Sequence, residues 1–163
     1  MREQLDHLPQ RAKDTARETN SFFKRLKKRP PKKLDAIVQE IHEEVFDKTD
    51  CLECANCCKT TGPLFERKDI DRIAKFLNMK PAQFEASYLR IDEDNDWVLQ
   101  RVPCAFLGED NACSIYDVRP KACREFPHTD RPKIYQIAQH TQKNVAVCPA
   151  AFEIVEKMKL RLP

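Results

Sequence analysis

Four of the chain's eight cysteines fall within the octapeptide CLECANCC, at Cys51, Cys54, Cys57 and Cys58. Thiolates ligate zinc and iron, and a Cys-x-x-Cys step lets two sulfurs turn toward one metal ion while backbone N–H groups point at them. Three thiols on one loop with a distant Cys-Pro also match the way in which bacterial ferredoxins hold a 4Fe-4S cluster. The octapeptide therefore predicts a metal centre and leaves zinc and iron both open.

The other four cysteines stand beside prolines, turns or predicted helix starts, which are common positions for metal ligands. They are Cys104, Cys113, Cys123 and Cys148. Eight thiols suit two zinc sites of four cysteines each, one iron-sulfur cluster with a separate zinc, or one polynuclear centre. Because neighbouring side chains diverge, Cys57 and Cys58 more naturally face or bridge two metal centres than share one. We expect all eight cysteines to be metal ligands.

Other uses of the cysteines are disfavoured by the rest of the sequence. The first twenty residues are charged throughout, without an apolar signal segment, and no run approaches the roughly 18 to 20 apolar residues needed to cross a bilayer. A cytoplasmic protein is expected, and a disulfide framework is disfavoured in that reducing compartment. Catalysis by a thiol would need a base such as His128, but a histidine in this position is more often a surface residue. A non-enzymatic role is therefore favoured, and an enzyme is left open.

Glycine content and charge restrict the cofactors further. Gly62 and Gly108 are the two glycines of the chain, so a glycine-rich nucleotide-binding loop cannot be built. Four thiolates on one Zn²⁺ leave a formal charge of −2, which nearby cations or N–H donors must stabilise. The candidate cations beside cysteines are Lys59, Arg119, Lys121 and Arg124. We expect Trp97, Phe106, Tyr116 and Phe126 to pack around the metal site, and His7, His42 and His140 to be solvated.

Apolar spacing predicts the elements that position the cysteines. KLDAIVQEIHEEVF, LFERKDIDRIAKFLNM and PAQFEASYLR each predict an amphipathic helix, the last beginning at Pro81. WVLQRVPCAFL, GEDN and ACSIY predict short strands around a turn. Proline at the first helical position makes Cys148 the expected N-cap of a final helix, CPAAFEIVEKMKL. The expected fold is mainly α with a small β-hairpin, in a compact, irregular, metal-stabilised cysteine-cluster domain.

The N-terminal segment differs from the rest in charge. Residues 1–33 contain eleven Lys and Arg against four Asp and Glu, a net of +7, so the remainder carries 3 − 7 = −4. The apolar residues of this segment look too sparse to bury a continuous stripe. It ends in KRLKKRPPKK, from Lys24 to Lys33, where the two prolines favour an extended linker. We therefore predict a basic arm over residues 1–33 and a cysteine-cluster domain over 34–163.

Taken together, these motifs resemble the CxxCxxCC cysteine-cluster family, the YkgJ-type zinc- or iron-chelating proteins. The matching segments are CLECANCC, PCAFL at 103–107, CSIYDVRPKACREFP at 113–127 and the late Cys148-Pro149. The resemblance omits the basic arm, and it implies metal chelation by the cysteines in a largely helical cytoplasmic domain. It extends to flagellin lysine-methylating proteins with an iron-sulfur centre, which raises the expectation of iron and leaves a protein-modifying enzyme open.

Three functions are consistent with these features. The leading one is a non-enzymatic metal-binding module whose basic arm docks it to a protein partner. The second is an iron-sulfur redox protein or a component of a methylating enzyme. The third is association with nucleic acid or the ribosome, because the seven cations of Lys24–Lys33 could contact phosphates. There are two alternatives for the basic arm. It could dock to a protein or to an anionic membrane through Phe22 and Phe23, or it could be a solvated tail.

Overall fold

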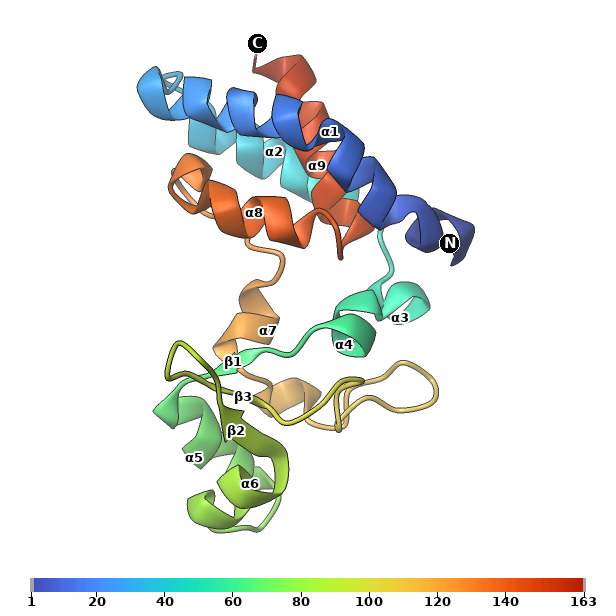
Figure 1. Cartoon of the computed structure of the whole chain (residues 1–163), viewed down its shortest axis with the longest axis vertical. Helices are drawn as coiled ribbons and strands as arrows, with labels where there is room; N and C mark the ends of the chain where they lie inside the picture. The colour runs from blue at the N-terminus through green and yellow to red at the C-terminus, as the bar shows by residue number, and fades with distance from the viewer. Residues whose placement is uncertain (1, 163) are drawn as a thin grey trace. The chain divides into compact units, whose positions relative to one another are not determined.

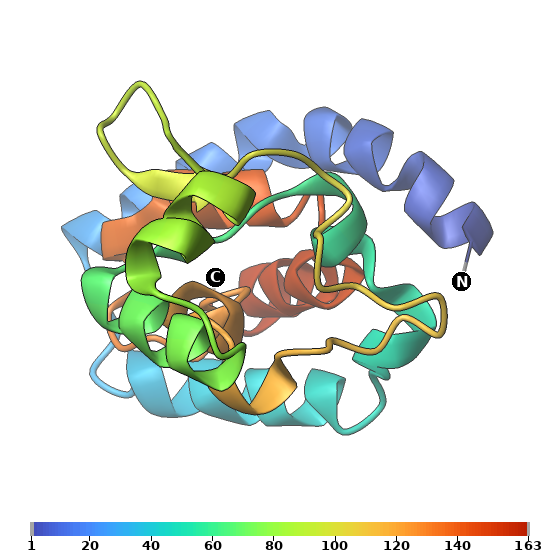
Figure 2. The same ribbon diagram turned by 90° about the horizontal axis from the view of Figure 1, so that it is seen from below.

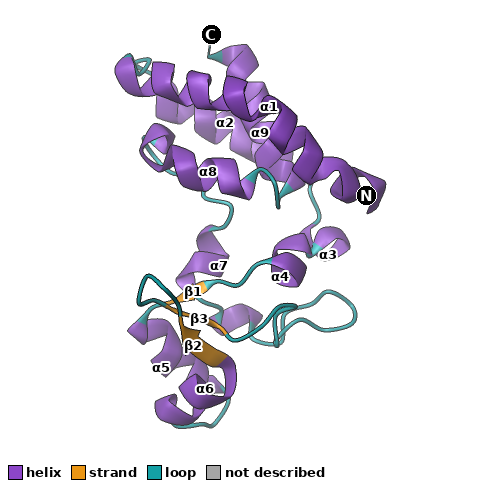
Figure 3. Ribbon diagram, in the orientation of Figure 1, coloured by secondary structure: helices purple, strands orange, loops and turns teal. Residues whose placement is uncertain are grey.

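The computed structural model describes residues 2–162 and divides into two compact units. Unit 1 comprises Met1–Cys54 and Pro127–Pro163, and unit 2 comprises Ala55–Phe126 (Figure 1). The described residues are mainly helical with one small antiparallel sheet (Figure 3), which confirms the expected fold class. No helix among them is long and apolar enough to cross a bilayer.

Unit 1 is built around its last helix. Its elements are α1 (Arg2–Lys28), α2 (Leu34–Phe46), α3 (Cys51–Cys54), the 3₁₀ turn η2 (Ile134–Ile137), α8 (Ala138–Asn144) and α9 (Pro149–Arg161). Figure 2 shows α9 running between α1 and α2, and it contacts both of them. Ala151, Ile154 and Met158 of α9 are fully buried at this junction. The predicted helices at 34–46 and 149–161 are thus confirmed, and their apolar faces meet in one core.

The N-terminal segment is part of that core, so the expectation that it buries no continuous stripe is wrong. Leu8, Phe22 and Leu26 of α1 are all buried. Ala12 and Thr19 are also buried between them, and the spacings from Leu8 to Leu26 are four, seven, three and four residues, as expected for one face of a helix. Because one of these side chains is small and the other carries a hydroxyl group, a count of large apolar residues does not detect the buried stripe. The helix also extends to Lys28, into the segment that was predicted to be a linker. The boundary between a basic arm and a cysteine-cluster domain at residue 33 stays a prediction.

Unit 2 combines short helices with the sheet. Its elements are α4 (Asn56–Thr60), β1 (Leu64–Phe65), α5 (Arg67–Phe76), α6 (Pro81–Tyr88), β2 (Leu89–Ile91), β3 (Trp97–Leu99), the 3₁₀ turn η1 (Tyr116–Val118) and α7 (Lys121–Glu125). The strand order is β1-β3-β2, with all pairs antiparallel. Phe84 lies at the centre of the core, its ring stacked on Phe106 at a centroid separation of 6.1 Å. The helices predicted around Ile70 and Phe84 are confirmed.

The hairpin of the sheet forms around the acidic turn rather than around GEDN. β3 pairs with β2 across DEDND, where Asp92 Oδ1 accepts hydrogen bonds from the N–H groups of Asp94 and Asp96. Across GEDN the described residues form a single bridge, Leu107 to Cys113. The strand pair expected there is therefore wrong in extent, because the turn closes on itself through Gly108 N–H and the Ala112 carbonyl. That bridge nevertheless brings two cysteine-bearing segments together.

Candidate metal centre

Unit 2 gathers the cysteines of four separate segments. The backbone N–H of Cys104 donates to the carbonyl of Cys58 at 2.7 Å, which ties the PCAFL segment to α4. The Leu107–Cys113 bridge then joins that segment to the start of CSIY. Within α4, the sulfurs of Cys57 and Cys58 are 4.0 Å apart. Cys123 lies on α7, which follows η1 after two residues.

The thiols of this group influence one another electrostatically. Burial, followed by charges on Cys58, Cys104 and Cys113, raises the pKa of the Cys123 thiol to about 12. Burial, followed by charges on Cys58 and Cys113, also raises the pKa of Cys104. For Cys58 the largest cause of its raised pKa is the hydrogen bond with Cys57, followed by burial. When these thiols ionise, their negative charges therefore repel one another, and a bound cation would reduce that repulsion.

Backbone N–H groups and cations act in the opposite direction. The N–H groups of Phe106 and Leu107 donate to the Cys104 sulfur, and that of Ile115 donates to Cys113, and each lowers the pKa of the thiol concerned. The positive charge of Arg119 lowers the pKa of both Cys113 and Cys123. Such N–H donors and cations are the partners that metal-bound thiolates require.

Unit 1 contains a second group of thiols. Cys51 and Cys54 are the first and last residues of α3, and Cys148 is the N-cap of α9, as predicted. The Ala151 N–H donates to the Cys148 sulfur at 3.5 Å, the arrangement expected of a helix N-cap. The pKa of Cys148 is raised to about 11, first by burial and also by charges on Cys51 and Cys54. Cys148 is therefore an electrostatic neighbour of the first two cysteines of CLECANCC.

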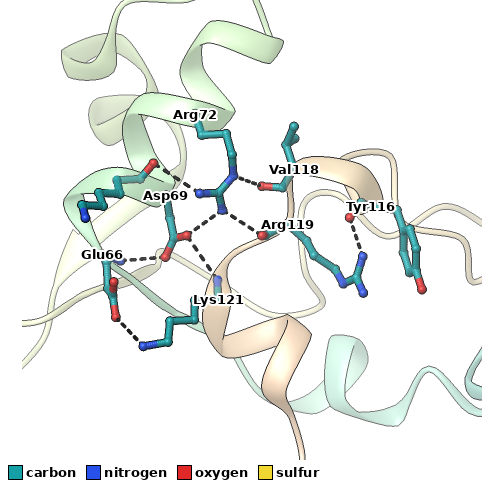
Figure 4. Close-up of polar contacts among 8 residues, drawn as sticks. Glu66, Asp69, Arg72, Tyr116, Val118, Arg119 and Lys121 are labelled. Atoms are coloured by element: carbon teal, nitrogen blue, oxygen red, sulfur yellow. Dashed lines mark hydrogen bonds and ion pairs between the residues drawn. The ribbon is translucent and has the colours of Figure 1, made fainter.

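A buried carboxylate on α5 fixes the segment that carries Cys113 and Cys123 (Figure 4). Asp69 is 2% exposed. Its Oδ1 accepts from Arg72 Nη2 at 2.6 Å and from the Lys121 N–H at 3.2 Å, and its Oδ2 accepts from the Glu66 N–H at 3.0 Å. One side chain thus ties the start of α5 to the start of α7.

Arg72 extends the same network to the residues before α7. Its Nε donates to the carbonyl of Val118 at 3.2 Å, and its Nη2 donates to the carbonyl of Arg119 at 2.9 Å. The guanidinium of Arg119 in turn lies 3.8 Å from the centroid of the Tyr116 ring and donates to the Tyr116 carbonyl (Figure 4). We call Asp69 and Arg72, with the backbone of residues 118–121, the α5 clamp. The clamp holds in place the Arg119 that acts on Cys113 and Cys123.

The donor set fits a thiophilic metal by its chemistry. The structure has all eight cysteines as thiols, and Cys51 is exposed while the others are half-buried. Among the side chains that the structure describes, no three from Cys, His, Asp or Glu are spaced so that they could hold one ion as they stand. The fit therefore rests on the identity of the donors, on the N–H groups aimed at three of the sulfurs and on Arg119. Which cysteines share an ion stays a prediction.

Some sequence expectations around the site need correction. Tyr116 is 58% exposed and stacks with Arg119 instead of packing in the core. His42 is half-buried rather than solvated, because its Nδ1 lies 2.9 Å from the Thr129 hydroxyl and its ring packs on Phe46. Lys121 pairs at the surface with Glu66. Sequence reasoning also missed Asp69, although an acidic residue directly beside the apolar face of DIDRIA was an available signal.

Comparison with known protein families identifies the sulfur-rich region. Residues 50–149 match the family CxxCxxCC, described as "Putative zinc- or iron-chelating domain". The chain belongs to this family. The match includes all eight cysteines and the α5 clamp, and it leaves out α1, α2 and most of α9. No solved structure matches the chain. The description of the family thus names chelation of zinc or iron, which is what the resemblance implied.

The clamp can be tested by removing its charge. We expect Asp69→Asn to lower the free energy of unfolding by about 2 kcal/mol, because a buried acceptor of hydrogen bonds from Arg72 and two backbone N–H groups is weakened. Asp71→Asn, an exposed carboxylate two residues along α5, is the matched control and should change stability by less than about 0.5 kcal/mol. Urea denaturation of both variants measures the difference. Equal effects would show that Asp69 has no special structural role.

Thiol reactivity tests the electrostatics of the site. In metal-free protein at pH 8, the thiolate fraction of Cys123 should be about 1,000-fold below that of an ordinary thiol, because its pKa is about 12 rather than 9.0 and the thiol form persists below that pKa. Alkylation with iodoacetamide, followed residue by residue by mass spectrometry, should therefore modify exposed Cys51 well before Cys123. Denaturant should equalise the two rates. Similar rates in the folded protein would contradict the assignment.

Proposed function

We propose that this chain is a non-enzymatic metal-binding module in which all eight cysteines ligate zinc or iron, and that it docks to a partner through its basic N-terminal region. The observation that carries the proposal is the electrostatic influence of neighbouring thiols on one another within each unit. Cys58, Cys104, Cys113 and Cys123 form the group within unit 2, with Cys57 beside Cys58. Cys51, Cys54 and Cys148 form the group within unit 1. This division favours more than one metal centre.

The protonation of the thiols supports ligand roles over catalytic ones. Reactive cysteines lie in electropositive environments that lower the thiol pKa. Here the pKa values of Cys104, Cys113, Cys123 and Cys148 are all raised, with burial as the first cause. A metal ion would displace the protons and use the thiolates as ligands, which is the usual chemistry of structural cysteine sites.

The metal and the alternative function are tested by one preparation. Elemental analysis of anaerobically purified protein, together with its visible spectrum, distinguishes zinc from an iron-sulfur centre. Stoichiometric zinc in a colourless protein supports a structural module. Iron with sulfide, and a broad absorbance near about 400 nm that dithionite bleaches, would instead support the redox protein or the component of a methylating enzyme.

Metal removal should unfold the cysteine-bearing parts of the chain. A metal that binds thiolates from distant segments adds its binding free energy to folding, so chelation should lower the melting temperature or abolish cooperative melting. The measurement is thermal melting followed by circular dichroism, before and after treatment with a chelator. Chelator already saturated with zinc is the control. A melting curve that does not move after verified loss of metal would contradict a structural role.

Substitutions in the two groups test how the ligands are shared. We expect Cys58→Ser and Cys148→Ser each to remove a definite fraction of the metal, because they belong to different groups, whereas a single shared centre would be emptied by either. Metal content per chain is measured by elemental analysis of folded protein. Thr60→Ala, which changes an exposed residue of α4, should retain all the metal. Unchanged metal content in Cys58→Ser would show that Cys58 is not a ligand.

A further inference from the structure

Arg119 differs from the other cations of unit 2 in its burial and in its partners. All Lys and Arg residues of unit 2 are exposed except Arg72 and Arg119, which are half-buried. Arg72 is matched by the buried carboxylate of Asp69, at 2.6 Å. Arg119, by contrast, forms no ion pair with a carboxylate among the described residues. Partial burial of a charge costs free energy unless an opposite charge lies nearby, so Arg119 requires an anion.

A series of backbone hydrogen bonds connects Arg119 to two cysteines. The Tyr116 N–H donates to the carbonyl of Cys113 at 3.2 Å, and the Arg119 N–H donates to the carbonyl of Tyr116 at 3.3 Å. On the other side, the carbonyl of Pro120 accepts from the Cys123 N–H at 3.0 Å. The α5 clamp holds the same stretch through the carbonyl of Arg119. Arg119 therefore lies in a fixed segment of backbone between Cys113 and Cys123.

The side chain of Arg119 is held by Tyr116 rather than by an acidic residue. Its Nη1 donates to the carbonyl of Tyr116 at 2.7 Å, and its guanidinium lies 3.8 Å from the centroid of the Tyr116 ring (Figure 4). A carbonyl group and an aromatic ring position a cation without neutralising it, whereas a carboxylate would cancel its charge. The arrangement therefore fixes the position of the guanidinium and leaves its full charge available to an anion.

The sulfurs of unit 2 supply the anion that Arg119 lacks. The positive charge of Arg119 lowers the pKa of both Cys113 and Cys123, so it acts on thiols at both ends of its segment. The other cations beside cysteines are less suited to this role, because all of them are exposed and solvent screens their charges. They are Lys59, Lys121 and Arg124, and Lys121 also pairs with Glu66.

We propose that Arg119, held by Tyr116 and the α5 clamp, is a positioning residue that offsets the negative charge of the metal–thiolate centre of unit 2 and so raises its affinity for metal. The inference rests on the proposed function, because it requires thiolate-bound metal in unit 2. A divalent ion bound by four thiolates carries a net negative charge, whereas the protonated thiols of the metal-free protein are neutral. A fixed cation therefore stabilises the metal-bound state more than the metal-free state.

Zn²⁺ is the probe. The full chain, purified with zinc bound, is equilibrated with chelator-buffered solutions of known free Zn²⁺, and zinc per chain is measured by elemental analysis. Arg119→Gln keeps an N–H donor for the Tyr116 carbonyl but removes the charge, and we expect it to lose at least about tenfold in affinity. The loss should be confined to the fraction of zinc that Cys58→Ser removes. Arg119→Lys keeps the charge, and Arg124→Gln removes an exposed charge directly beside Cys123, so both should stay within about threefold of the wild type.

Tyr116 gives a second test that does not change Arg119. Its side chain is 58% exposed, so it can be substituted without opening the core. Tyr116→Leu removes the ring that holds the guanidinium and should weaken zinc binding by about threefold, the size expected of an exposed cation–π contact. Tyr116→Phe keeps the ring and should bind zinc as the wild type does. Circular dichroism establishes that each variant is folded.

Three results would overturn the inference. They are unchanged zinc affinity in folded Arg119→Gln, equal losses in Arg119→Gln and Arg119→Lys, and an equal loss in Arg124→Gln. The second would show that hydrogen-bonding geometry matters rather than charge. If Arg119→Gln does not fold, equal zinc binding by Tyr116→Leu and Tyr116→Phe overturns it instead. Wild-type protein without thiolate-bound metal would contradict the proposed function itself, whereas metal binding that is insensitive to Arg119 contradicts this inference alone.

Discussion

The buried contact between Asp69 and Arg72 is the constraint on which unit 2 depends. A buried carboxylate costs several kcal/mol unless it is paired and hydrogen-bonded, and Asp69 meets that condition with Arg72 and two backbone N–H groups. Since Arg72 also reaches the carbonyls of Val118 and Arg119, the pair fixes backbone that has little regular structure of its own. The backbone between Cys113 and Cys123 is therefore held by a helix that contains no cysteine.

Electrostatics link this framework to the sulfurs. Ionised thiols within one group oppose one another, and burial increases the penalty, as the raised pKa of Cys123 indicates. Arg119 and the N–H groups near Cys104 and Cys113 offset part of it. A bound cation would offset the rest, so binding of metal and ordering of these segments favour each other.

Local patterns predicted a large part of the fold and the types of the candidate ligands. The helices around Ile70 and Phe84 followed from apolar spacing, and the N-cap role of Cys148 followed from Pro149. The grouping of the cysteines could not be predicted in this way, because it depends on contacts between distant segments, such as Cys104 N–H with the Cys58 carbonyl. The packing of α1 was missed for a different reason, since small residues complete its buried stripe.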